Sequence, residues 1–176
     1  DECSYIVRTE HFSKFGIGSV KGTISNVSTR PGSGGSRSVL VDGTLSNSYL
    51  ALYPLARMGV LETTFALPNG QVDSEFAVGA QVLISTTIRN YQQDTQTYVF
   101  IVQILDEDRV VQSISWQTGM LDRGQEYIVG QSWVAEAAGD YQVRIYVWNS
   151  FAAPDPLSSL EVRTLQVSDT GPTESA

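Results

Sequence analysis

The feature that most constrains the fold is the segment 139–148, whose side chains alternate strictly between two kinds. One face carries the apolar side chains Tyr141, Val143, Ile145 and Val147. The other carries Gln142, Arg144, Tyr146 and Trp148. A period of two is typical of a β-strand with one buried side. Burial of four such side chains is worth roughly 1.5–3 kcal/mol each, so this strand can anchor a core.

Similar segments recur at a regular spacing from residue 71 onward. The candidate strands are 72–78, 81–89, 97–105, 109–117, 126–134, 140–149 and 160–167, with turn-forming residues between them. Seven short strands at this spacing are typical of an immunoglobulin-type sandwich, in which a tyrosine near the start of a late strand bonds back to the chain. We assign that role to Tyr141. The sequence therefore predicts an all-β chain with an antiparallel immunoglobulin-like β-sandwich.

The remainder of the chain divides around this sandwich. Residues 1–70 are predicted to form an additional β-rich N-terminal region, residues 71–168 the sandwich, and residues 169–176 a polar tail. A hairpin is expected from 38–41 and 44–53, because Asp-Gly between them favours the positive φ of a tight turn. Residues 50–58 are the only candidate helix, and Pro54 interrupts them.

Composition excludes several classes of function. Nineteen acidic against eleven basic residues give a net charge of −8, with no basic cluster, which argues against nucleic acid as a partner. No apolar run approaches the roughly 20 residues of a membrane-spanning helix.

Charged residues make up only 17% of the chain, a balance common in extracellular β-proteins. The start at Asp1, without Met, fits a mature product whose leader has been removed, and equally a chain that was trimmed at its start. We therefore expect a secreted or cell-surface protein.

Few side chains are suited to catalysis. A hydrolase needs a nucleophile, a base and an orienting group, whereas the chain has one histidine, His11, and one cysteine, Cys3. Asp106, Glu107 and Asp108 are either a weak Ca²⁺ site or an acidic turn, and no EF-hand spacing accompanies them. The prediction is a protein without catalytic activity, cofactor or metal site.

Two residues of the N-terminal region are candidates for covalent modification. Cys3 is either an unpaired thiol or the site of a disulfide between two chains. Asn26 opens an Asn-Val-Ser sequon, which carries a glycan only in an exported protein.

The aromatic residues raise the question of an interaction surface. The run 98–105 is apolar on both faces, so a cover is expected outside the sheet, either the first seventy residues or a neighbouring molecule. Trp116 shares a face with Ile114 and Val110 and is predicted to pack in the core, whereas the sequence leaves the side of Trp133 open. Tyr146 and Trp148 face away from the core, where they form either a protein interface, which we favour, or a sugar-stacking platform.

Several segments resemble a known family. They are 98–106, 113–116, 131–133, 139–150 and 156–158. These residues look like the immunoglobulin-like repeats of secreted archaeal surface proteins, which are similar to bacterial cell-adhesion-related domains. The resemblance implies export and a structural or adhesive role. Such proteins include subunits of threads and pili, in which an N-terminal strand can complete the sheet of the next subunit.

The leading hypothesis is an extracellular subunit that self-assembles, as a homo-oligomer or a cell-surface filament. In it the arm residues Tyr5, Ile6 and Val7 pair with a neighbour's sheet, although folding back onto their own chain is an open alternative. The alternative function is a monomeric module that binds carbohydrate or Ca²⁺ within a larger surface protein.

Overall fold

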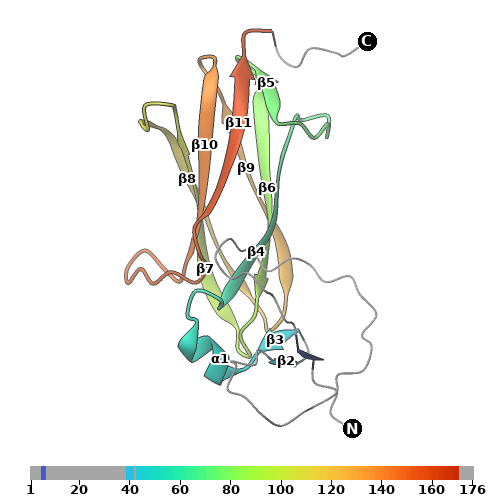
Figure 1. Cartoon of the computed structure of the whole chain (residues 1–176), viewed down its shortest axis with the longest axis vertical. Coiled ribbons are helices and arrows are strands. Elements are labelled where there is room, and N and C mark those ends of the chain that lie inside the picture. The colour runs from blue at the N-terminus through green and yellow to red at the C-terminus, as the bar shows by residue number, and fades with distance from the viewer. Residues whose placement is uncertain (1–4, 7–38, 42, 171–176) are drawn as a thin grey trace.

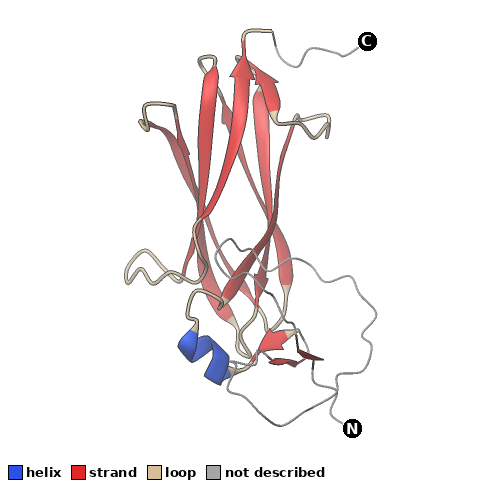
Figure 2. Ribbon diagram, in the orientation of Figure 1, coloured by secondary structure: helices blue, strands red, loops and turns tan. Residues whose placement is uncertain are grey.

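The computed structural model describes residues 5–6, 39–41 and 43–170, and strands dominate this part of the chain (Figures 1 and 2). The larger sheet contains, in spatial order, β5 (Glu75–Ala77), β11 (Glu161–Ser168), β10 (Gly139–Trp148), β7 (Gln96–Leu105) and β8 (Val111–Leu121). The smaller sheet contains β4 (Met58–Ala66), β6 (Gln81–Asn90) and β9 (Glu126–Val134). The predicted all-β sandwich is confirmed. One pair, β5 with β11, is parallel, so the larger sheet is mixed rather than purely antiparallel.

A continuous apolar core lies between the two sheets. The largest side chains that are fully buried there include Phe76, Phe100, Met58, Ile84, Ile88, Ile104 and Ile145. In β10, the four side chains predicted to face inward are all buried, and the intervening ones are only partly covered. The alternation in 139–148 therefore identified both the strand and its inner face.

The tyrosine corner is present at the start of β10. The Tyr141 hydroxyl donates to the backbone carbonyl of Ala137, four residues upstream, at 2.8 Å. Its ring also packs edge to face against Trp133, with centroids 4.8 Å apart. The alternation does not decide the side of Trp133, and in the structure this side chain packs against the core. The contact fixes the turn between β9 and β10.

The sandwich begins earlier than the predicted boundary at residue 70. β4 pairs with β6 from Met58 opposite Asn90 to Ala66 opposite Leu83. The turn at Pro68-Asn69-Gly70 is closed by a hydrogen bond from the Gly70 amide to the Leu67 carbonyl at 2.8 Å. It lies between β4 of the smaller sheet and β5 of the larger sheet, so it is inside the sandwich. A strong turn signal was therefore mistaken for a domain boundary.

A small sheet and one helix lie at the pole of the sandwich where β4 begins (Figure 1). The sheet contains β1 (Tyr5–Ile6), β2 (Val39–Val41) and β3 (Thr44–Leu45), and the helix is α1 (Asn47–Leu52). The predicted hairpin exists between β2 and β3, but its second strand has two residues because Ser46 caps a helix, its hydroxyl accepting from the Tyr49 amide at 3.3 Å. The helix therefore starts before the predicted 50–58 and ends ahead of Pro54. Leu45, Tyr49 and Leu50 pack with Tyr91 in a second small core.

Candidate interaction face

The outward side of the larger sheet is the candidate functional site. We define the outer face as the outward-facing side chains of β10, β7 and β8, which are Gln142, Arg144, Tyr146, Trp148, Thr97, Val99, Ile101, Gln103, Leu105, Val111, Ile114, Trp116, Thr118 and Met120. They lie in cross-strand rows, because residues directly opposite each other in a sheet point to the same side. One row runs Tyr146, Ile101, Trp116, and the next runs Trp148, Val99, Thr118.

The rows explain why β7 is apolar on both faces. Val99 and Ile101 are buried although they are not part of the central core. Ile101 lies between Tyr146 and Trp116 on the adjacent strands. The expected cover thus comes, in the described structure, from large side chains of the same sheet.

Trp116 points outward, so its predicted place in the core is wrong. Its side chain is 56% exposed, as is that of Ile114, and Met120 is 64% exposed. Apart from Leu121, which is buried in the core at the end of the strand, the inward side of β8 carries small or polar residues, and Ser113 and Ser115 lie opposite the core residues Ile104 and Val102. Alternation shows which residues share a face but not which face turns inward. At this edge strand the more apolar face turns outward.

The inward side of β8 is adapted to its position at the rim. Gly119 lies directly over the Tyr98 ring, where a Cβ atom would clash with that side chain. Gln117 crosses to the other sheet, donating from its side-chain amide to the Gly130 carbonyl at 2.9 Å. These contacts hold β8 in the orientation that exposes Trp116.

Phe151 extends the apolar surface beyond the strands. It lies in the loop between β10 and β11, is 50% exposed, and meets the Trp116 ring edge to face, with centroids 5.7 Å apart. Sequence analysis missed this residue, because a ring contact from a loop leaves no periodic signal.

Tyr146 and Trp148, predicted to form an interface, do lie on this face. Both are partly covered, and their rings are 6.1 Å apart. The Tyr146 hydroxyl donates to Gln103 Oε1 at 3.0 Å. They form the inner part of the outer face, and Trp116 forms its most exposed aromatic part.

Charge is nearly absent from this surface. The outer face contains no Asp or Glu, in a chain with nineteen acidic residues. Its one charged member, Arg144, donates from Nε to Gln142 Oε1 at 2.7 Å. Aromatic and Met side chains without acidic residues are typical of the centre of a protein interface.

The arm residues lie partly within the described chain. β1 pairs antiparallel with β2 of the same chain, Tyr5 opposite Leu40 and Ile6 opposite Val39. This pairing agrees with the fold-back alternative. Val7, Cys3 and Asn26, with His11, lie outside the described residues.

The acidic turn between β7 and β8 is held by its own hydrogen bonds. Asp106 accepts from the Val110 amide at 2.8 Å and from the Gln112 side chain at 2.6 Å. Glu107 accepts from the Asp140 amide at 3.0 Å. Among the residues that the structure describes, no group of three or more His, Cys, Asp or Glu side chains is placed to hold a metal ion. In the described ranges no helix has the length and apolar character to span a membrane.

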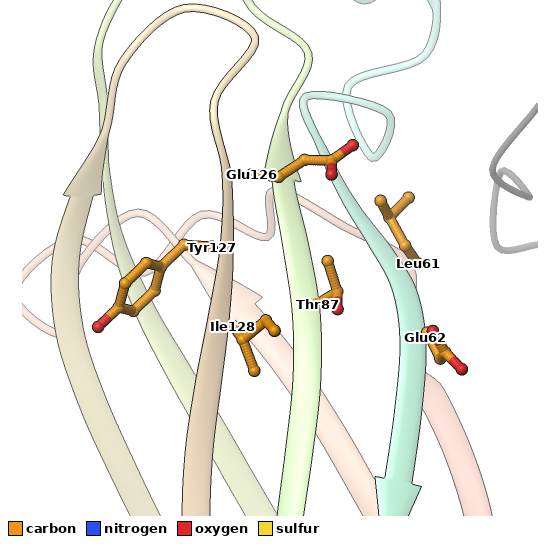
Figure 3. Close-up of a pocket in the computed structure, with 6 residues that line it drawn as sticks. All are labelled: Leu61, Glu62, Thr87, Glu126, Tyr127 and Ile128. Atoms are coloured by element: carbon orange, nitrogen blue, oxygen red, sulfur yellow. The ribbon is translucent and has the colours of Figure 1, made fainter. Parts of the chain in front are cut away.

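A shallow hollow lies on the outward side of the smaller sheet (Figure 3). The residues around it are Leu61, Glu62, Thr87, Glu126, Tyr127 and Ile128, of which Tyr127 turns its ring to the opposite side of β9 (Figure 3). Glu126 is paired with Arg89 at 2.9 Å. This surface combines exposed apolar groups with acidic ones, unlike the outer face.

Comparison with known proteins identifies the fold and nothing narrower. No protein-family model matches the chain, and no curated protein matches it. Among solved structures, the C-terminal domain of wzt is similar at a TM-score of 0.58 and 10% identity, over 64% of this chain and 74% of that one. A Bacteroides uniformis β-glucuronidase is similar at a TM-score of 0.50 and 15% identity, over 59% of this chain and only 13% of that one. The chain therefore has a β-sandwich fold found in domains of larger proteins.

Proposed function

We propose that this chain is a non-catalytic structural module of an exported surface assembly, and that it associates with a second copy of itself through the outer face. The orientation of β8 carries the proposal. This strand exposes Ile114, Trp116 and Met120 and turns serines toward the core. A soluble domain gains nothing from that arrangement in isolation, because exposed apolar surface on an edge strand promotes association.

The size of the outer face suits a stable contact. Three strands about 4.8 Å apart and about 3.4 Å per residue over ten residues give roughly 500 Å² in projection. Side chains that protrude from the sheet, together with Phe151 in the loop, make the solvent-accessible area larger than this projected area. The total is then on the order of the 800 Å² per partner that a standard interface buries.

Charge favours this face over others for pairing of identical chains. Two molecules with a net charge of −8 repel each other in general. The repulsion is smallest where both surfaces lack acidic residues. Association through the outer face brings two such surfaces together.

The course of the chain supports a role in an extended assembly. β4 begins at the pole beside α1, and β11 ends at the opposite pole (Figure 1). A module entered at one pole and left at the other can be placed end to end with others. The low charge content and the resemblance of 71–168 to archaeal surface repeats support export and a structural role. Because β1 is paired within its own chain, the proposal places the contact on the outer face rather than on an exchanged N-terminal strand.

The experiment is sedimentation equilibrium of the purified chain and two matched variants. Trp116→Thr removes the most exposed aromatic side chain of the outer face. Ile128→Thr changes a side chain that is 65% exposed on the smaller sheet. Truncation of a central interface Trp costs about 2 kcal/mol or more, so Trp116→Thr should weaken association about thirtyfold. Ile128→Thr should leave it unchanged, and a wild-type chain that stays monomeric at high concentration rejects the proposal.

A second candidate is binding of a glycan by the same face. The observation in its favour is the mixture of rings with amide and hydroxyl groups, since Gln103, Thr97 and Thr118 lie among Tyr146 and Trp116. A sugar can stack on such rings and bond to such groups. Titration of monomeric chain with oligosaccharides, followed by NMR, tests this. Saturable shifts confined to the outer face would support it.

A further inference from the structure

Residues 149–157, the first part of the loop between β10 and β11, are tied to the sandwich at both ends. The Asn149 side-chain oxygen accepts from the amides of Ser150 at 2.7 Å and Asp155 at 2.8 Å. The Asn149 amide donates to the Asp155 carbonyl at 3.0 Å, which closes the loop. Leu157 is fully buried in the core, and its amide donates to the Val147 carbonyl at 2.8 Å. The loop therefore has a defined shape, with Phe151 near its tip.

Arg57 joins this loop to the segment between α1 and β4. Its guanidinium is 2.7 Å from Asp155 Oδ2, and it also donates to the Pro156 carbonyl at 2.8 Å and the Pro54 carbonyl at 2.8 Å. The hydrogen bond from Arg57 lowers the pKa of the Asp155 carboxyl below its ordinary value of 3.8. The backbone carbonyl of Arg57 in turn accepts from the Tyr91 amide at 3.0 Å. One side chain thus connects two segments far apart in sequence.

Phe151 connects the position of this loop to the outer face. Its ring meets Trp116 at 88°, an edge-to-face contact that depends on where the loop is held. Trp116 projects from an edge strand and is more than half exposed, so the contact with Phe151 restricts the orientations of its indole. A restricted side chain loses less entropy when it enters an interface.

We propose that Arg57 is the positioning residue of the outer face: by bonding Asp155 and Pro156 it holds Phe151 against Trp116 and so pre-organises the surface that docks the second copy. This inference rests on the proposed function. Arginine suits the role because its planar guanidinium directs several donors at once, which the single ammonium of lysine cannot reproduce.

The test uses the full chain with Arg57→Lys, which keeps the positive charge and removes the planar guanidinium that bonds Asp155 and Pro156 together. The matched control is Arg89→Lys, because Arg89 also bonds a carboxylate, that of Glu126 on the smaller sheet, and a backbone carbonyl, that of Gly43 between β2 and β3, away from the outer face. Asp155→Asn is a second variant, at a side chain that is 52% exposed and therefore tolerant of change. The readouts are the nuclear Overhauser contact between the Trp116 and Phe151 rings in dilute, monomeric chain, and the association constant from sedimentation.

The proposal predicts that Arg57→Lys and Asp155→Asn lose the ring contact and associate about three- to tenfold more weakly, while Arg89→Lys matches the wild type. If Arg57 acts through Phe151, the double variant Arg57→Lys, Phe151→Ala associates no more weakly than Phe151→Ala alone. Retention of the ring contact in both Arg57→Lys and Asp155→Asn overturns the proposal. It is also overturned if the losses of association caused by Arg57→Lys and Phe151→Ala add fully in the double variant. If the wild type does not associate at all, the proposed function fails. The ring contact in the monomer then still decides whether Arg57 positions Phe151.

Discussion

Trp116 and Phe151 meet edge to face, with ring centroids 5.7 Å apart and ring planes at 88°. One residue lies on an edge strand and the other on a loop, and each is at least half exposed. Their contact makes the apolar surface of the larger sheet continuous with the loop between β10 and β11.

Two isoleucines on the same face should differ sharply in their effect on stability. Ile101 is buried between Tyr146 and Trp116, whereas Ile114 is 56% exposed. Ile101→Ala should lower the free energy of unfolding by about 2–5 kcal/mol, because it leaves a cavity. Ile114→Ala should lower it by about 0.5 kcal/mol or less. Urea unfolding of dilute chain measures both, and equal losses would mean that the outer side of β7 is not covered as described.

Two tyrosines of β10 provide a second comparison. Tyr141→Phe removes the bond to the Ala137 carbonyl and keeps the ring in place, so it should cost about 0.5–1.5 kcal/mol. Tyr146→Phe removes a bond to Gln103 in a partly covered position and should cost less. The same unfolding assay applies. A larger loss for Tyr146→Phe would contradict the facing of β10.

Alkaline pH should destabilise the fold through buried tyrosines. Burial raises the pKa of Tyr49, Tyr91, Tyr98 and Tyr141 above the ordinary value of 10.0. These hydroxyls therefore ionise more readily in the unfolded chain, so stability is fully present below pH 10.0 and falls as pH rises through the folded-state pKa values. Urea midpoints and tyrosinate absorbance, recorded together up to about pH 11, measure the effect. Constant stability over that range would contradict the burial of these hydroxyls.

Removal of residues 1–12 should leave association intact. The deletion removes β1, which pairs with β2 of its own chain, and it leaves the outer face unchanged. Sedimentation of the shortened chain should give the wild-type association constant. Loss of association with retained folding would instead favour exchange of the N-terminal strand between copies.

The bounds of the strands could be predicted from the sequence more accurately than their pairing in the sheets. The segment 126–134 was predicted with the bounds of β9, and 97–105 within one residue of β7, because turn residues frame both. The parallel pairing of β5 with β11 joins segments far apart in the chain, and no local pattern encodes it. The helix at Asn47–Leu52 depends on the cap at Ser46, which lies inside the segment 44–53 that the sequence predicts as the second strand of a hairpin.

The candidate face was only half predictable. Outward placement of Tyr146 and Trp148 followed from the alternation in β10, since the opposite side was clearly the more apolar. For Trp116 the same rule failed, because β8 is an edge strand whose inner side faces the rim of the sandwich. Phe151 could not be found at all, since its position depends on hydrogen bonds of Asn149 within the loop and on the bond from Arg57, 99 residues away in the chain, to Pro156.

Concentration-dependent oxidative footprinting shows whether two copies of the chain associate through the outer face. The chain has two methionines, and they are placed as an internal comparison: Met120 is 64% exposed on the outer face, and Met58 is 1% exposed in the core. As the concentration rises, Met120 and Trp116 should become protected from oxidation, while Tyr127 on the smaller sheet keeps its reactivity. Association of the chain with Met120 and Trp116 still fully reactive, or with protection at Tyr127 instead, would contradict the account.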